Sequence, residues 1–324
     1  MSSASGATSP TQAALLSAEE TFALSSLELR ARAVAEGMLV GTHRSRRFGS
    51  STEFAEYKVY TPGDELKHLD WRTYARTDRY FVRRYEEETN LDIYLVLDTS
   101  GSMAYAGGAR GAFGVSKLQY ASTLAAALVW LAARHSDAVS LTLFAADEQL
   151  YLPPRARQDH VSALFAGLEN LEPAGPTDAE QVVKTLAGRI KRRSLVVFLS
   201  DFLEVGEGPL AALGILRQQG SDALVLQVMD PDELEFPFDG VVRFEDLEGD
   251  REVQVDAPAI RASYLAELTE FLQRVRSECI QRDLRQHLIR TDTAPVIALR
   301  EALLGTLGDT RGNSSRADAV PARG

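Results

Sequence analysis

Cysteine is nearly absent from this sequence, since Cys279 is the only one among 324 residues. A single cysteine cannot form an internal disulfide, which favours a reducing compartment. The chain also lacks any run of about 18 apolar residues, the length that an α-helix needs to cross a bilayer. Residues 1–10 have neither the basic nor the apolar region of a signal peptide. We therefore expect a soluble, cytoplasmic protein with no membrane span.

Positive charge is scarce as well: the formal net charge is -11 and the pI is near 5.1. Binding along nucleic-acid phosphates needs a basic surface, so nucleic-acid binding is not the expected main function. Residues 71–85 interleave arginines with aromatic side chains, a composition that can bind single strands by stacking. Acids at Asp78 and at 86–88 favour ion pairing and a protein-binding surface here. Nucleic-acid binding through 71–85 is kept as an alternative.

Patterns typical of strands and helices alternate along most of the chain, which is 45% hydrophobic. This alternation predicts an α/β protein with a doubly wound, mostly parallel sheet and helices on both faces, preceded by a small helix-plus-β segment. The expected strands of the sheet are 91–97, 138–144, 149–152 (stopped by two prolines), 194–200, 223–229 and 287–290. The expected helices are 19–38, 116–135, 160–168, 179–192, 209–219, 259–285 and 295–304. Residues 241–244 and 252–255 are expected to pair as a small hairpin.

Composition divides the chain into four parts. Residues 1–17 and 304–324 are expected to be disordered tails. Residues 18–90 combine an amphipathic helix with a small β segment. Residues 91–303 hold the α/β domain.

Polar side chains follow the first strand of the predicted sheet at once, in Asp98-Thr99-Ser100-Gly101-Ser102. Alternation places the side chains of Asp98, Ser100 and Ser102 on one side of an extended loop, and Gly101 lets the backbone turn. Hard oxygen donors on a tight loop suit a divalent cation such as Mg²⁺. A Ser/Gly turn capped by an aspartate is the simpler interpretation of these residues.

Two distant stretches favour the metal site. A second buried-strand pattern ends in Asp201, and a loop containing Thr177 precedes a helix. In the common strand order 3-2-1-4-5-6, the first and fourth strands are neighbours, and ligands bind beyond their carboxyl ends. Asp98 follows the first strand and Asp201 the fourth. The predicted metal ligands are therefore Asp98, Ser100, Ser102, Thr177 and Asp201.

Two carboxylates in a partly buried crevice repel each other, and an uncompensated buried charge costs several kcal/mol. The Asp98 and Asp201 motifs contain no Lys or Arg. A divalent cation is therefore the simplest counter-charge, although a distant arginine could also serve. Mg²⁺ is the expected cofactor, with Mn²⁺ or Ca²⁺ as alternatives.

The set D-x-S-x-S, a loop Thr and a later Asp resembles the metal-ion-dependent adhesion site (MIDAS) of von Willebrand factor A domains. The resemblance covers about residues 91–303 and implies their Rossmann-like fold. Three upstream motifs resemble the segment that precedes this domain in the bacterial domain-of-unknown-function 58 family. These motifs are Gly41-Thr42-His43-Arg44-Ser45, Tyr60-Thr61-Pro62-Gly63-Asp64 and Asp70-Trp71-Arg72.

The resemblance implies a function as well. It implies that Ser100 and Ser102 bind the cation directly, and that Thr177 and the two aspartates bind it directly or through water. A Glu or Asp of a protein partner would fill an open coordination position. The implied partner is a MoxR-type AAA+ ATPase, with this protein as an adaptor in a chaperone or complex-assembly system.

Enzymatic motifs are missing. The chain has no Walker motif, no G-x-G-x-x-G and no G-x-S-x-G, and none of its five histidines stands in a recognisable relation to Ser100. A phosphatase using Asp98 as nucleophile would need a second Asp where Ser100 stands. We expect no enzymatic activity, and keep a metal-dependent phosphatase or hydrolase using Asp98 as an alternative.

Overall fold

The computed structural model divides the chain into two units, one of residues 43–90 and one of residues 1–42 with 91–324. The helices near the N-terminus thus belong to the larger unit, not to the 18–90 segment in which the sequence analysis placed them. The structure describes residues 15–40, 54–59, 73–74, 76, 80–85, 91–107, 114–173, 175–191, 193–203, 208–248 and 252–309.

The smaller unit contains an antiparallel pair of strands, β1 (Phe54–Val59) and β2 (Phe81–Tyr85). The rings of Tyr74 and Tyr80 stack with their centroids 4.3 Å apart. Residues 71–72, 75 and 77–79 of the 71–85 stretch and all three upstream motifs lie outside the described residues.

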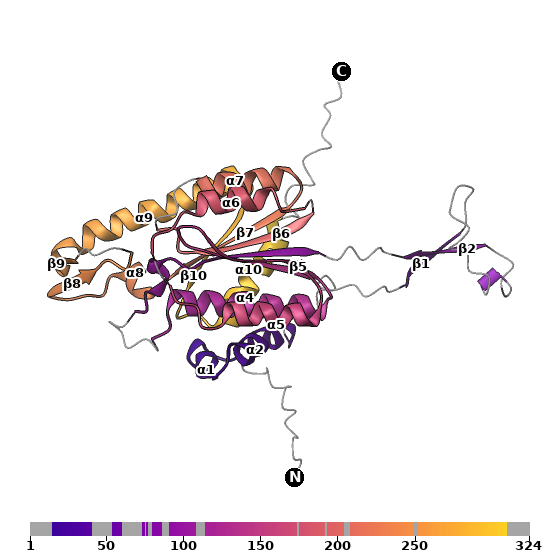
Figure 1. Cartoon of the computed structure of the whole chain (residues 1–324), viewed down its shortest axis with the longest axis horizontal. Coiled ribbons are helices and arrows are strands. Elements are labelled where there is room, and N and C mark those ends of the chain that lie inside the picture. Colours follow the sequence, from indigo (N-terminus) through magenta and orange to yellow (C-terminus); the bar gives the residue numbers. More distant parts are fainter. Residues whose placement is uncertain are drawn as a thin grey trace, which may run out of the picture. The chain divides into compact units, whose positions relative to one another are not determined.

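The larger unit is built on a six-stranded sheet with the order β10-β7-β6-β3-β4-β5 (Figure 1). Counted along the chain from β3, this is the predicted order 3-2-1-4-5-6. Every neighbouring pair is parallel except β4 and β5, which are antiparallel. The strands are β3 (Asp92–Asp98), β4 (Ala138–Phe144), β5 (Glu148–Arg155), β6 (Ser194–Ser200), β7 (Asp222–Met229) and β10 (Arg285–Arg290).

Helices cover both faces of this sheet, as the α/β prediction requires (Figure 1). One face packs against α4, α5 and α10, with α2 lying on these helices, and the other face packs against α6, α7 and α9. Strand β3 alternates between the two cores, with Leu95 and Leu97 in the first and Tyr94 and Val96 in the second. The helices are α1 (Ala18–Phe22), α2 (Leu27–Val40), α4 (Lys117–Arg134), α5 (Gln158–Leu168), α6 (Ala179–Ala187), α7 (Gly208–Gln218), α8 (Pro231–Glu235), α9 (Ala257–Gln281) and α10 (Pro295–Asp309).

A two-stranded antiparallel sheet, separate from the main one, joins β8 (Val241–Glu245) to β9 (Glu252–Asp256). This is the predicted hairpin. Figure 1 shows it at the far left of the larger unit.

Several boundaries differ from the prediction for identifiable reasons. The single helix expected over 19–38 is two helices, because the Ser26 hydroxyl accepts the Leu29 N–H at 3.3 Å and starts a new helix. Strand β5 continues through Pro153 and Pro154, which an edge strand tolerates, and its register with β4 shifts between Val139 and Leu141.

Three helix ends also differ. Helix α6 ends at Ala187, before the predicted end at 192. Helix α9 begins at Ala257 and ends at Gln281, before the predicted end at 285. Helix α10 continues to Asp309, into the segment predicted to be a disordered tail from 304. No helix within the described ranges has both the length and the apolar character needed to cross a bilayer.

Candidate metal centre

Strands β3 and β6 bring Asp98 and Asp201 to the same edge of the sheet. The two strands pair in parallel with Leu97 opposite Leu199, so their carboxyl ends coincide. The Ser200 hydroxyl donates to Asp98 Oδ2 at 2.7 Å, across the two strand ends. Asp98 and Asp201 are almost completely buried, with 0% and 1% of their surface exposed. The structure therefore brings the two predicted carboxylates together in the crevice that the strand order implies.

The loop after β3 folds back on Asp98. The Ser100 N–H donates to Asp98 Oδ1 at 2.9 Å, and a short 3-10 helix follows over Gly101–Ala104. The hydroxyls of Ser100 and Ser102 lie 3.1 Å apart. Ser100 is buried and Ser102 is half-buried. Three of the predicted ligands thus share one tight loop.

The loop that carries Thr177 joins the same rim. The Gly101 N–H donates to the Gly175 carbonyl at 2.9 Å, and the Asp178 N–H donates to the Ala145 carbonyl beyond β4 at 2.8 Å. The Thr177 hydroxyl oxygen is buried and has no hydrogen-bond partner among the described residues. Such an oxygen is costly to bury unless a further group occupies the space in front of it.

Burial and a like charge make ionised Asp98 unfavourable. Burial first, and then the negative charge of Asp201, raise the pKa of Asp98 to about 6, although bonds from Ser100 and Ser200 oppose the shift. In the described part of the chain, no Lys or Arg side chain pairs with Asp98. At neutral pH its charge is therefore held by hydrogen bonds alone.

Lys117 is a site residue that the sequence analysis missed. Its Nζ, fully buried at the start of α4, donates to Asp201 Oδ2 at 2.7 Å and to Glu233 Oε1 at 2.6 Å. Burial opposes its charge, but Asp201 and Glu233 outweigh burial and raise the pKa of Lys117. The inference that Asp201 requires a divalent counter-charge is therefore corrected, because a lysine supplies one. The available signal was the position of Lys117 in the first turn of the helix after the first strand, next to the ligand-binding edge.

Glu248 is a second residue that the sequence analysis did not include. It lies in the loop between β8 and β9, and its Oε1 accepts the Ser102 N–H at 3.1 Å. Its Oε2 is buried without a hydrogen-bond partner among the described residues. The sequence pattern did not indicate this contact, because acidic residues are common in hairpin loops.

The donor set fits a hard cation better than a transition metal. Within the described ranges, no three His, Cys, Asp or Glu side chains are grouped so that they could hold a metal ion. The centre instead combines two carboxylates with three hydroxyls, the oxygen chemistry that Mg²⁺ prefers. Two adjacent ligands of an octahedral Mg²⁺ lie about 3 Å apart. The 3.1 Å between the hydroxyls of Ser100 and Ser102 is compatible with that spacing.

A family model described as "Protein of unknown function DUF58" matches residues 56–273. The chain belongs to the DUF58 family. The uncharacterized proteins Rv1480 of Mycobacterium tuberculosis and Mb1516 of Mycobacterium bovis are each 28% identical to this DUF58 protein over 285 residues. Each of these alignments covers 86% of this chain and 84% of the relative.

Solved structures that match this DUF58 protein share little sequence with it. BatB from Bacteroides thetaiotaomicron is 18% identical with a TM-score of 0.41, over 68% of this chain and 99% of BatB. An aerotolerance-related membrane protein from Bacteroides fragilis is 20% identical with a TM-score of 0.43, over 66% and 99%. A von Willebrand factor type A protein from Catenulispora acidiphila is 14% identical with a TM-score of 0.30, over 46% and 34%. We draw nothing about function from likenesses this distant.

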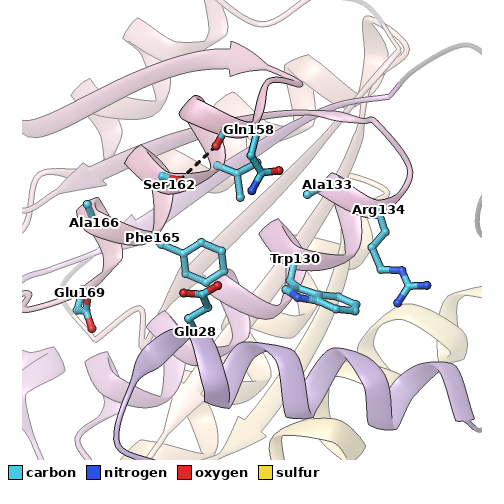
Figure 2. A pocket seen from close by; sticks show the side chains of 10 residues that line it. Glu28, Trp130, Ala133, Arg134, Gln158, Ser162, Phe165, Ala166 and Glu169 are labelled. Carbon is cyan, nitrogen blue, oxygen red and sulfur yellow. Dashed lines mark hydrogen bonds between the residues drawn. The ribbon is translucent and has the colours of Figure 1, made fainter.

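A separate hollow of about 520 Å³ opens between α2, α4 and α5. Figure 2 shows Glu28 of α2, Trp130 of α4 and Phe165 of α5 around it. Its residues on α4 belong to the last turns of that helix, whereas Lys117 lies in the first. A rise of 1.5 Å per residue places them about 20 Å or more from Lys117 along the helix. The hollow is therefore not part of the site.

Proposed function

We propose that this DUF58 protein is a metal-dependent protein-binding adaptor. A divalent cation, Mg²⁺ in the first place or else Mn²⁺ or Ca²⁺, would be held by Asp98, Ser100, Ser102, Thr177 and Asp201. A Glu or Asp of the partner would complete its coordination. The observation that carries the proposal is that one rim holds both a buried carboxylate, Asp98, and the buried hydroxyl of Thr177, which has no hydrogen-bond partner among the described residues.

The contacts of each ligand suggest its role. The hydroxyls of Ser100 and Ser102 lie close enough together to bind one cation directly. Both oxygens of Asp201 already accept hydrogen bonds, from Lys117 Nζ and from the Leu203 N–H, so Asp201 would act through a water. The cation would supply a positive charge that attracts an acidic side chain, and the chain's own residues would position it.

Apolar side chains on the rim offer further contacts. Leu203 follows Asp201 and is 40% exposed, and Leu247 adjoins Gly101 and is 47% exposed. A single metal bridge is a small part of a specific interface, which normally buries more than about 1,000 Å². Leucines beside the cation would add affinity that does not depend on the metal. The cation would make binding of the partner depend on the metal.

The partner that the DUF58 resemblance implies is a MoxR-type AAA+ ATPase, and the adaptor would have no catalytic activity of its own. No described histidine contacts the Ser100 hydroxyl. His160 Nε2 is hydrogen-bonded to the Val139 carbonyl oxygen at 2.8 Å. ATP hydrolysis would then belong to the partner. Phosphate release by the purified adaptor, lost in Asp98→Asn, would instead support the phosphatase alternative.

The test measures Mn²⁺ binding and partner binding with purified proteins. Calorimetric titration should show one Mn²⁺ per chain, lost in Asp98→Asn and retained in the control Asp159→Asn, which removes an exposed acid. Immobilised adaptor should retain a purified MoxR-type ATPase of the same organism in Mg²⁺ and release it in EDTA. Retention that is unchanged by EDTA and by Asp98→Asn would reject metal-dependent binding.

A further inference from the structure

Leu247 and Glu248, in the loop between β8 and β9, pack directly on the loop of Gly101 and Ser102. A Cβ atom added at Gly101 would lie 2.2 Å from the Leu247 carbonyl oxygen and 3.0 Å from Glu248 Cγ. The first of these neighbours is backbone and cannot rotate away. Gly101 therefore permits an approach that any larger residue would prevent. This approach places the Glu248 carboxylate beside Ser102.

Two neighbours of the same loop each carry a buried oxygen that has no hydrogen-bond partner among the described residues. Glu248 Oε2 comes from the hairpin, whose other carboxylate oxygen binds the Ser102 N–H. Thr177 Oγ1 comes from the loop that is bonded to Gly101 through Gly175. A buried carboxylate oxygen without a donor is costly, and more so next to other acids. A cation bound at this loop is the kind of group that such oxygens need.

We propose that Glu248 is an internal ligand of the metal centre. It would supply, from within the chain, the acidic group that the proposed function assigns to a partner. The resting protein would then have a closed centre, and a partner's Glu or Asp would bind by displacing the hairpin tip. This inference rests on the proposed function. Because Asp201 would act through a water, Asp98 and Glu248 would be the two carboxylates that bind the cation directly, and the hairpin would compete with the partner.

Aromatic packing holds the strands of the hairpin, next to the loop that carries Glu248. The ring of Phe244, which lies opposite Val253 in the strand pair, packs on Phe236 and Phe238, with centroids 5.7 and 5.3 Å apart. Beyond this pair, Leu247 in the loop is 47% exposed. A two-stranded hairpin has little stability of its own, so this aromatic packing holds its strands, and the bond from the Ser102 N–H holds Glu248.

The first arm of the test combines Mn²⁺ titration with hydrogen exchange on the full chain. In the wild type, Mn²⁺ should slow amide exchange in 241–256. Glu248→Gln should weaken Mn²⁺ binding about tenfold, the equivalent of 1.4 kcal/mol, and should abolish that slowing. The matched control Glu252→Gln removes an exposed acid of the same hairpin and should behave as wild type.

The second arm measures competition with the partner. At saturating Mn²⁺, Glu248→Gln should bind the MoxR-type ATPase more tightly than wild type, because no internal acid has to be displaced. Gly101→Ala should do the same while keeping every proposed ligand, since its Cβ pushes the hairpin tip away. A merely structural role of Glu248 predicts no gain of partner binding.

The outcomes separate the two proposals. If Asp98→Asn abolishes Mn²⁺ binding while Glu248→Gln matches wild type in Mn²⁺ affinity, exchange and partner binding, the metal centre stands and the internal ligand is refuted. If the wild type binds no Mn²⁺, the proposed function fails and the internal ligand fails with it.

Discussion

Replacing Asp98 by Asn should stabilise the metal-free protein while abolishing metal binding. Asp98 is buried with Asp201 nearby, and its pKa is raised from an ordinary 3.8 to about 6. Because the folded state holds this proton more tightly than the unfolded state, stability falls as pH rises from about 4 to about 6. A shift of about two pKa units corresponds to about 3 kcal/mol. Above pH 6 the ionised carboxylate therefore opposes folding by up to that amount.

Asparagine keeps most of the local bonds. Its amide oxygen can accept the Ser100 N–H, and its amide NH₂ can donate to the Ser200 hydroxyl, which at present donates to Asp98. That hydroxyl also accepts the Phe202 N–H at 3.0 Å, so one bond must rearrange at a cost of about 1 kcal/mol. The expected net gain of Asp98→Asn at about pH 8 is therefore about 1–3 kcal/mol.

The assay is urea denaturation of wild type and Asp98→Asn, in EDTA and in Mg²⁺. In EDTA the variant should be the more stable, and its advantage should shrink as pH falls from about 8 to about 5. A cation at about 100 times its Kd stabilises the wild type alone by about 2.7 kcal/mol, which should remove or reverse the advantage. A variant less stable than wild type in EDTA at about pH 8 would contradict this account of Asp98.

Further predictions concern three positions outside the five proposed ligands. Lys117→Met should lower the free energy of unfolding by about 3–5 kcal/mol in urea denaturation, because it leaves two buried carboxylates unpaired. A loss below about 1 kcal/mol would show that the ion pair contributes little. Burial raises the pKa of Cys279 to about 12. A thiol reagent at about pH 8 should therefore label Cys279 in denaturing urea and not in the folded protein. Rapid labelling of the folded protein would contradict its burial. Ser116→Ala should cost about 1 kcal/mol by removing the hydroxyl that caps α4, and an unchanged urea midpoint would mean that the cap is dispensable.

Local pattern predicted most of the sheet. Apolar runs followed by turn residues located β3 and β6, and counting strands gave the order that makes them neighbours. The sequence also predicted that Asp98 and Asp201 end adjacent strands, and that the Thr177 loop lies on the same edge. These predictions succeeded because strand periodicity is visible in the local sequence, and because parallel sheets follow a general geometry. Whether the five residues bind a metal stays a prediction.

The predicted element boundaries were wrong where a side-chain hydrogen bond or strand pairing outweighed the hydrophobic pattern of the sequence. The serine that starts α2 divided one predicted helix into two, and an irregular edge pairing carried β5 through two prolines. The motifs at 41–45, 60–64 and 70–72 lie outside the described residues, so the interpretation of that segment stays a prediction.

The amino-acid sequence by itself determined which oxygens stand at the carboxyl edge of the sheet. Tertiary structure alone decided which charges face them. Lys117 reaches Asp201 across 84 positions and Glu233 across 116, and Glu248 reaches Ser102 across 146. Such contacts depend on how a helix and a hairpin pack on the sheet, which no local spacing encodes. Packing therefore provides the lysine that balances Asp201 and the acid that closes the proposed centre.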